Sequence, residues 1–248
     1  MTQDAQSSRG TLAIFAGAGK IPVRVVEAAR AQGRELLIIG MKGVTNPALE
    51  AYPIEWWNWG QAGRLFKLLK SYKCSEFVLI GKVERPDIRD VKFDLGTVTR
   101  LPRIVTMLVG SDGDVLHAIV NYMEENGYRA IGAHEVSTSL CLTEAQLGAA
   151  APGRTDKLDI ETGIRIARQI GALDIGQGVI VESGRVLAVE GAEGTDAMIA
   201  RSADLRLGKR HGRSGVLVKL PKPGQDLRVD MPTIGVKTIH NLAEAGFA

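Results

Sequence analysis

The feature that most constrains the fold is a short apolar run that leads through a glycine turn into a helical stretch and then into a second apolar run. Thr11–Phe15 is the first run, Gly17–Pro22 is the turn, and Leu36–Ile39 is the second run, after a helical pattern that ends at Gly33. A strand, a crossover helix and a strand of these lengths form a βαβ unit with parallel strands. The sequence therefore predicts an α/β fold that opens with a Rossmann-like parallel sheet.

Two domains are predicted, because this pattern recurs up to a cluster of small residues and then changes. Further strands are expected at Ile54–Trp57, Phe77–Ile80 and Arg129–Gly132, helices at Gln61–Tyr72, Ile104–Val109 and Asp114–Asn126, and a charged loop at Arg85–Leu101. After the cluster Ala149–Gly153 we expect a helix at Asp159–Ile170, a hairpin of Gly178–Val181 and Val186–Val189 around Ser183-Gly184, and a strand at Gly215–Leu220. The predicted domains are 1–150, which is Rossmann-like, and 151–248, which is a C-terminal α/β domain.

Composition and charge exclude several classes of protein. The 248 residues carry a net charge of +3, which is dispersed and unlike the basic clusters of nucleic-acid binders, so no nucleic-acid partner is expected. Neither a membrane-spanning run of about 20 apolar residues nor a signal peptide is recognisable, so a cytoplasmic protein is expected. Cys74 and Cys141 lie in apolar stretches and are interpreted as buried thiols.

Two places in the first half are candidates for binding. Gly17 and Gly19 precede a helix, where backbone N–H groups and the helix dipole favour an anion. A tight turn without a ligand is the alternative, because Pro22 replaces the third glycine of a dinucleotide fingerprint and no Ser or Thr follows Lys20 as in a P-loop. Lys82 follows a strand, at the sheet edge where α/β proteins bind ligands, with a solvated loop as an equal alternative.

The aromatic residues and histidines give weaker signals. Trp56, Trp57 and Trp59 are interpreted as packing residues, with stacking on a base or contact with a lipid as the alternative. The four histidines have neither metal-site nor triad spacing, and no catalytic role is assigned to them.

The C-terminal third gives the strongest chemical signal. Glu190–Asp196 presents three carboxylates on a glycine-rich loop, and acids alternate with bases through Lys222–Gly235. Carboxylates on such loops suit Mg²⁺, and beside Lys and Arg they suit metal-assisted chemistry at a phosphate; surface ion pairs are the alternative. In an extended segment Asp226, Arg228 and Asp230 project to one side, which predicts a phosphate site where Asp226 holds metal or orients water.

Five motifs occur in a specific order over most of the chain. They are Ala16–Pro22, Gly81–Pro86, Asp174–Gln177, Glu190–Arg201 and Val216–Gly235. Together they resemble the I-type UDP-2,3-diacylglucosamine pyrophosphatase family of lipid A biosynthesis. The resemblance implies water attack on the nucleoside-side phosphorus, giving UMP and 2,3-diacylglucosamine 1-phosphate (lipid X), with Mg²⁺ or Mn²⁺. It also implies a C-terminal fold peculiar to the family and a substrate bound between the two domains.

The resemblance also implies roles for particular residues. Asp226 and Asp230 are expected to be catalytic and to hold the metal together with Glu193 and Asp196. Residues expected to bind the substrate are Gly17, Gly19, Lys82, Glu190, Thr195, Lys219, Lys222 and Arg228. Because the family continues into a further strand and helix after the residue matching Ala248, a truncated sequence or a shortened relative is expected.

Two other function classes stay open. A nucleotide-cofactor oxidoreductase would need a glycine at Pro22 and an acid after Leu36–Ile39, where Gly40 and Met41 stand. The second class is a non-catalytic nucleotide or lipid carrier of the same fold. An assay of UMP release with and without EDTA separates the pyrophosphatase, the oxidoreductase and the carrier. The expected partners are the substrate, lipid X, a second copy of the chain and, through the substrate's acyl chains, the inner-membrane surface.

Overall fold

The computed structural model describes residues 10–83, 91, 93–100, 102–104, 112–141, 147–206 and 212–248. The chain divides into two compact units, each with its own sheet and core. The first unit comprises Met1–Thr143 together with Asp226–Asp230, and the second comprises Glu144–Gln225 together with Met231–Ala248. A five-residue segment from late in the sequence therefore belongs to the N-terminal unit.

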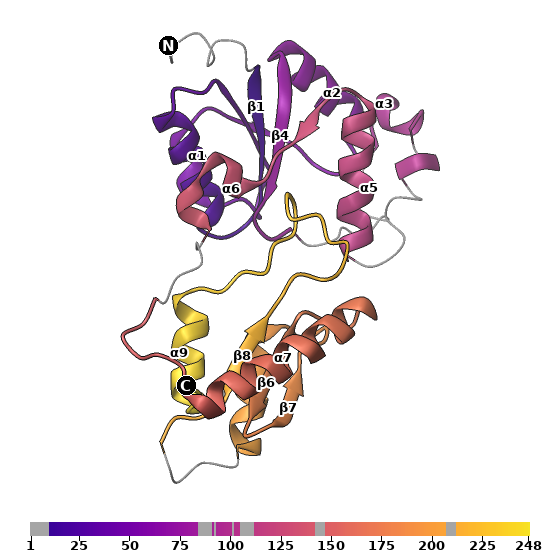
Figure 1. The fold of residues 1–248 in the computed structure, drawn as a ribbon. Coiled ribbons are helices and arrows are strands. Elements are labelled where there is room, and N and C mark those ends of the chain that lie inside the picture. Colours follow the sequence, from indigo (N-terminus) through magenta and orange to yellow (C-terminus); the bar gives the residue numbers. More distant parts are fainter. Residues whose placement is uncertain are drawn as a thin grey trace, which may run out of the picture. The chain divides into compact units, whose positions relative to one another are not determined.

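The first unit contains a five-stranded parallel sheet in the order β3-β2-β1-β4-β5 (Figure 1). Its strands are β1 (Thr11–Ala16), β2 (Leu36–Gly40), β3 (Ile54–Trp56), β4 (Cys74–Ile80) and β5 (Arg129–Ala130). This order places the topological switch point between β1 and β4, and open α/β sheets bind their ligands outside the carboxyl ends of the strands at that point. The predicted parallel sheet is confirmed.

Helices cover both faces of this sheet, which is why its strands are apolar without alternation. Helices α1 (Ile21–Ala31) and α6 (Ala133–Val136) lie on one face, and α2 (Ala62–Ser71) and α5 (Asp112–Glu125) lie on the other (Figure 1). Successive residues of β1 divide between the two cores, with Leu12 and Ile14 facing α1 and Ala13 facing α2 and α5. The short elements of this unit are η1 (Pro47–Ala51), α3 (Leu95–Val98) and η3 (Thr138–Leu140).

The second unit contains a three-stranded antiparallel sheet in the order β7-β6-β8. Its elements are α7 (Arg154–Ala172), β6 (Gly178–Glu182), β7 (Arg185–Val189), α8 (Thr195–Ser202), η4 (Ala203–Leu205), β8 (Val216–Lys219) and α9 (Val236–Ala245). Helix α7 packs on one face of the sheet against Val179 and Val181, while α8 and α9 pack on the other against Ile180. The mixed α/β fold with two parts is thus confirmed.

The predicted hairpin has a turn that its sequence explains. Ser183 and Gly184 have φ values of 53° and 78°, and a two-residue turn with both φ values positive matches the twist of the two strands that it joins. The buried carboxylate of Asp159 on α7 accepts hydrogen bonds from both turn N–H groups, at 2.8 Å from Ser183 and 2.6 Å from Gly184. A helix residue therefore fixes the hairpin in place.

Several expectations need correction. Thr195 begins helix α8, so the Glu190–Asp196 stretch is not a loop throughout, and Asp196 lies in the first helical turn. Helix α9 and the short α3 and α6 were not expected. Cys74 and Cys141 are half-buried rather than buried, although burial raises the pKa of the Cys74 thiol to about 11. Residues 105–109 of the expected helix Ile104–Val109, and residues 85–90, 92 and 101 of the Arg85–Leu101 loop, lie outside the described residues.

In the described ranges, every helix is too short or too polar to cross a bilayer.

Candidate active site

The turn after β1 packs against the segment that follows β4. Gly17 donates a backbone hydrogen bond to the Ile80 carbonyl at 2.8 Å, and Ala18 and Lys82 exchange two backbone hydrogen bonds of 2.8 and 3.2 Å. A Cβ atom on Gly17 would lie 2.7 Å from the Lys82 carbonyl oxygen and 2.8 Å from Val83 Cγ2. Glycine is required here by the close approach of two backbones, which brings two of the predicted binding segments together at the switch point.

Gly19 occupies a different environment in the same turn. Its φ is +98°, and a Cβ atom there would have no neighbour within 4 Å. Its carbonyl accepts a hydrogen bond of 2.7 Å from the Asn46 side chain, and the Thr45 hydroxyl donates to the Ala16 carbonyl at 2.5 Å. The segment after β2 thus holds the Gly17–Gly19 turn in place. Anion binding at the N–H groups of that turn stays a prediction.

The Asp226–Asp230 segment forms a turn. The backbone N–H groups of Val229 and Asp230 both donate to the Asp226 carbonyl, at 3.1 and 3.0 Å. The prediction of an extended segment is therefore wrong, and the alternation of residues 226, 228 and 230 does not create a common strand face. Val229 instead packs against the core beneath α2 and α5, which favours the turn over an extended path.

Arg228 holds this turn to α5 and holds the Asp226 carboxylate. Its guanidinium reaches both oxygens of Asp226, with Nε 2.9 Å from Oδ1 and Nη2 2.7 Å from Oδ2. Its Nη1 donates to Glu124 Oε1 at 2.7 Å. Arginine presents its donors in a planar fork, so one residue can bind two carboxylates in fixed directions.

Two residues of α5 in this cluster were missed from the sequence. His117 Nε2 accepts a hydrogen bond of 3.1 Å from the backbone N–H of Asp226, and Glu124 is the second partner of Arg228. They are seven residues apart, so they lie on the same face of the helix. Their helical spacing was the available sign that the two residues share a face. It could not link them to the 226–230 motif, which is about 100 residues away in the sequence.

The cluster keeps Asp226 ionised. Hydrogen bonds from the Arg228 guanidinium hold the pKa of the Asp226 carboxyl below its ordinary value, against the opposing effect of burial. The same two carboxylates raise the pKa of Arg228 above its usual range. Asp226 is therefore a charged, weakly basic group whose side chain is only 12% exposed.

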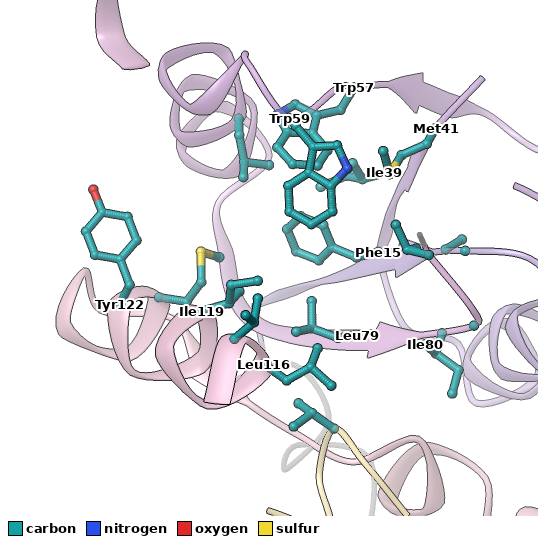
Figure 2. A pocket seen from close by; sticks show the side chains of 18 of the residues that line it. Phe15, Ile39, Met41, Trp57, Trp59, Leu79, Ile80, Leu116, Ile119 and Tyr122 are labelled. Carbon is teal, nitrogen blue, oxygen red and sulfur yellow. The ribbon is translucent and has the colours of Figure 1, made fainter. Parts of the chain in front are cut away.

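An apolar cavity of about 420 Å³ opens beside this cluster, on the face of the sheet covered by α2 and α5. Figure 2 shows Phe15 and Leu79 of the sheet facing Leu116 and Ile119 of α5, with the indoles of Trp57 and Trp59 along one wall. The ring of Trp57 meets Phe15 edge-on at 6.5 Å and lies 5.5 Å from Trp59. The lining residues include Gly17, Gly81, Lys82, Val229 and Asp230, so the cavity reaches the switch point and the 226–230 turn.

In the second unit, three predicted binding residues form one buried network. Lys219 Nζ lies 2.9 Å from Glu190 Oε2 and 2.9 Å from the Thr195 hydroxyl, which itself donates to Glu190 Oε1 at 2.6 Å. Lys219 ends β8, Glu190 follows β7, and Thr195 begins α8. The charges of Glu190 and Lys219 are paired where their side chains are each 9% exposed, as burial requires.

The remaining predicted site residues of this unit, Glu193, Asp196 and Lys222, each have a polar partner at its surface. Glu193 accepts hydrogen bonds from Arg201, which lower the pKa of the Glu193 carboxyl. Asp196 accepts from Asn241 of α9 at 2.9 Å. Lys222 Nζ lies 2.6 Å from Asp174 Oδ1.

The predicted metal ligands do not form a complete set within either unit. Asp226 and Asp230 belong to the first unit, and Glu193 and Asp196 to the second. Across the described ranges, no three His, Cys, Asp or Glu side chains converge as a metal site would require. Both oxygens of Asp226 are also engaged by Arg228, so metal binding at these residues stays a prediction.

Taken together, these features define a two-part α/β protein whose first unit has room for a ligand with a charged part and an apolar part. Family models agree with this division: the LpxI N-terminal domain matches residues 11–140, and the LpxI C-terminal domain matches residues 143–248. The chain belongs to the LpxI family. It is similar to UDP-2,3-diacylglucosamine pyrophosphatase LpxI of Caulobacter vibrioides, with 39% identity over 240 residues that cover 96% of this chain and 86% of the relative.

Proposed function

We propose that this protein hydrolyses the pyrophosphate bond of UDP-2,3-diacylglucosamine, releasing UMP and 2,3-diacylglucosamine 1-phosphate in lipid A biosynthesis. The observation that carries the proposal is the 39% identity to a pyrophosphatase of that name across 96% of the chain, which includes both domains. The first unit adds physical support, because an ionised carboxylate and an apolar cavity lie together at its sheet edge.

The proposed role of Asp226 follows from its electrostatics. A general base works best with a pKa near the operating pH, whereas Arg228 lowers the pKa of Asp226 below its ordinary value. Asp226 therefore suits orientation of the attacking water, or charge stabilisation, better than abstraction of a proton. Asp230, which lines the cavity from the same turn, is the second catalytic candidate.

Positive charge for the diphosphate would come first from Lys82 of the first unit; Lys219 and Lys222 stay predicted binding residues, and within the second unit they are paired with Glu190 and Asp174. Lys82 lines the cavity at the carboxyl end of β4, where a phosphate beside the 226–230 turn would meet it. Arg228 has a different role in this proposal, because Asp226 and Glu124 already occupy most of its donors. It positions the catalytic carboxylate and leaves the phosphate to the lysines.

A divalent cation, Mg²⁺ or Mn²⁺, belongs to the proposal as a requirement to be tested. The assay is UMP release from UDP-2,3-diacylglucosamine by the purified chain, with and without EDTA, followed by addition of each metal. Release that EDTA abolishes and Mg²⁺ or Mn²⁺ restores supports hydrolysis and the metal together. Release that resists EDTA supports hydrolysis alone.

The same assay separates the other function classes. Saturable binding of the substrate without release of UMP would indicate a non-catalytic carrier. A nicotinamide-dependent reaction would indicate an oxidoreductase, although Gly40 and Met41 at the end of β2 offer no acid for a ribose. We also propose a cytoplasmic protein that contacts the inner membrane transiently and forms a homodimer, to be tested by cell fractionation and by light scattering.

A further inference from the structure

We propose that the exposed face of helix α7 docks the protein onto the anionic surface of a lipid bilayer. The choice of a bilayer rests on the proposed function, because a substrate with two acyl chains is held in a membrane. The inference adds to that function a defined surface in the second unit through which the protein would meet the membrane.

The exposed face of α7 is rich in basic side chains. Its members recur three or four residues apart, the spacing that aligns side chains along one side of a helix. In the sequence the cations are separated by other residues, and only the helix gathers them. The exposed residues of this face, here called the basic face, are Arg154, Lys157, Leu158, Glu161, Arg165, Arg168, Gln169 and Ala172.

The cations of the basic face lack carboxylate partners. Among the described residues, none of its arginines and lysines forms an ion pair, and Glu161 is its acidic member. Elsewhere at the surface, Arg64, Arg103 and Arg201 are each paired with a glutamate. Unpaired cations that gather on one side of a helix attract an anionic partner.

The buried side of α7 fixes the direction of the basic face. Helix α7 covers one face of the antiparallel sheet (Figure 1). Gly163 allows a close approach, since a Cβ atom there would lie 2.5 Å from Val218 Cγ2. The buried Asp159 carboxylate also holds the hairpin turn at Ser183 and Gly184. The cations are therefore presented together before a partner arrives, which lowers the entropic cost of binding.

Apolar side chains on and beside the basic face favour a bilayer over a nucleic acid. Leu158 lies among the cations and is 55% exposed, and Leu173, at the end of the helix, is 71% exposed. At a bilayer surface, Lys and Arg meet the headgroups while leucine side chains enter the boundary of the acyl layer. A nucleic acid is bound through its phosphates and would leave the leucines in water.

Co-sedimentation with vesicles tests the docking without a measurement of activity. The full chain should bind vesicles of equal parts phosphatidylcholine and phosphatidylglycerol, and should bind pure phosphatidylcholine much more weakly. A high salt concentration should release it, because salt at physiological strength already screens surface charges beyond about 8 Å. Equal binding to both kinds of vesicle, or binding to neither, would overturn the proposal.

A pair of matched charge variants locates the surface. Arg165→Glu with Arg168→Glu changes the basic face, while Lys67→Glu with Lys70→Glu makes the same change in net charge at the same spacing on exposed residues of α2. Because each cation near an anionic bilayer strengthens binding about fivefold, the α7 variant should bind the phosphatidylglycerol vesicles at least about thirtyfold more weakly. The α2 variant should bind near the wild-type level. Equal losses would show that net charge, rather than α7, attracts the vesicles.

A second pair of variants tests the choice of a bilayer. Leu158→Ser should weaken vesicle binding at least about fivefold, because the side chain no longer gains from leaving water. Leu95→Ser, at a residue of the first unit that is 88% exposed, should leave the binding unchanged. Both positions are exposed, so each variant should unfold at the wild-type temperature. Wild-type binding by Leu158→Ser would overturn the bilayer as the partner, because a nucleic acid or an acidic protein needs only the cations.

Release of UMP from substrate in detergent micelles separates this proposal from the proposed function. The variant Arg165→Glu with Arg168→Glu should hydrolyse micellar substrate at the wild-type rate and substrate in phosphatidylglycerol vesicles more slowly. Vesicle binding without release of UMP would contradict the proposed hydrolysis and leave the docking surface intact. Release of UMP by a chain that does not bind these vesicles would overturn the docking surface alone.

Discussion

At the scale of single residues, the candidate site depends on how Arg228 holds Asp226. The guanidinium donates to both carboxylate oxygens of Asp226 and also to Glu124. The same contacts therefore orient the Asp226 carboxylate and keep it ionised. His117 adds a contact to the backbone of the same turn. Changes at Arg228 and at His117 should therefore affect catalysis in different ways.

Arg228→Lys should move the acid limb of the pH–rate profile upward. Asp226 has a folded-state pKa below its ordinary value of 3.8, so its charge favours the folded protein above pH 3.8 and this contribution is lost as the pH falls through the lower folded-state pKa. Lysine lacks the planar fork, and without it the pKa of Asp226 should rise towards its ordinary value. The profile is measured by UMP release, and Arg103→Lys, at a surface pair with Glu125, serves as the control. An unchanged acid limb would remove Arg228 from this role.

His117→Phe should lower kcat about two- to tenfold and leave KM nearly unchanged, because one hydrogen bond that positions the Asp226 backbone is lost. His117→Gln keeps an acceptor on the side chain and should recover part of the activity. Equal loss in both variants would indicate that the ring packs rather than accepts. Steady-state kinetics of the two proteins decide between these outcomes.

At the scale of elements, the close contact between the β1–α1 turn and the end of β4 should be sensitive to a single methyl group. Gly17→Ala places a Cβ atom 2.7 Å from the Lys82 carbonyl, so the two segments must separate. We expect a loss of stability of about 1–3 kcal/mol and a raised KM, since Lys82 moves with the contact. Gly148→Ala, where a Cβ atom has no neighbour within 4 Å, is the matched control. Equal thermal stability of the two variants would contradict the packing argument.

The hairpin of the second unit offers a test unconnected with catalysis. Asp159→Ala removes the buried carboxylate that accepts hydrogen bonds from the N–H groups of Ser183 and Gly184, and the loss of these bonds to a charged group should destabilise the protein by about 1–3 kcal/mol. Asp156→Ala, in the same helix, removes an exposed hydrogen bond to Gly153 and should have a smaller effect. Urea denaturation of the two variants measures the difference, and a larger loss in Asp156→Ala would show that Asp159 does not stabilise the hairpin.

The sequence predicted the buried strands well, because a parallel strand covered on both faces is a short apolar run that few other structures share. It failed for the 226–230 segment, whose alternating residues resemble a strand. There the distant partners Glu124 and His117 and the insertion of Val229 decide the conformation, and local spacing cannot reveal them. Helix α9 was missed although Val236, Ile239 and Leu242 follow helical spacing and Gly246 ends it with a φ of 82°.

At the scale of the whole molecule, a short segment late in the sequence belongs to the N-terminal unit. Its neighbours on both sides, Gln225 and Met231, belong to the second unit. The conformation of the Asp226–Asp230 turn thus depends on contacts made by the first unit, although the turn is encoded within the C-terminal domain of the family. The predicted domain boundary at residue 150 stays a prediction. A single boundary does not describe a chain whose residues Asp226–Asp230 belong to the first unit.

The most direct test of the central claim is the release of UMP from UDP-2,3-diacylglucosamine by the full chain and by its Asp226→Ala variant. The account predicts hydrolysis by the wild type and a loss of about a thousandfold or more in kcat in the variant, which should remain folded and bind substrate with similar affinity. Asp230→Ala should show an equal or smaller defect. Near-normal UMP release by a folded Asp226→Ala variant would contradict the catalytic assignment, and no release by the wild type, with Mg²⁺ or Mn²⁺ supplied, would contradict the proposed function itself.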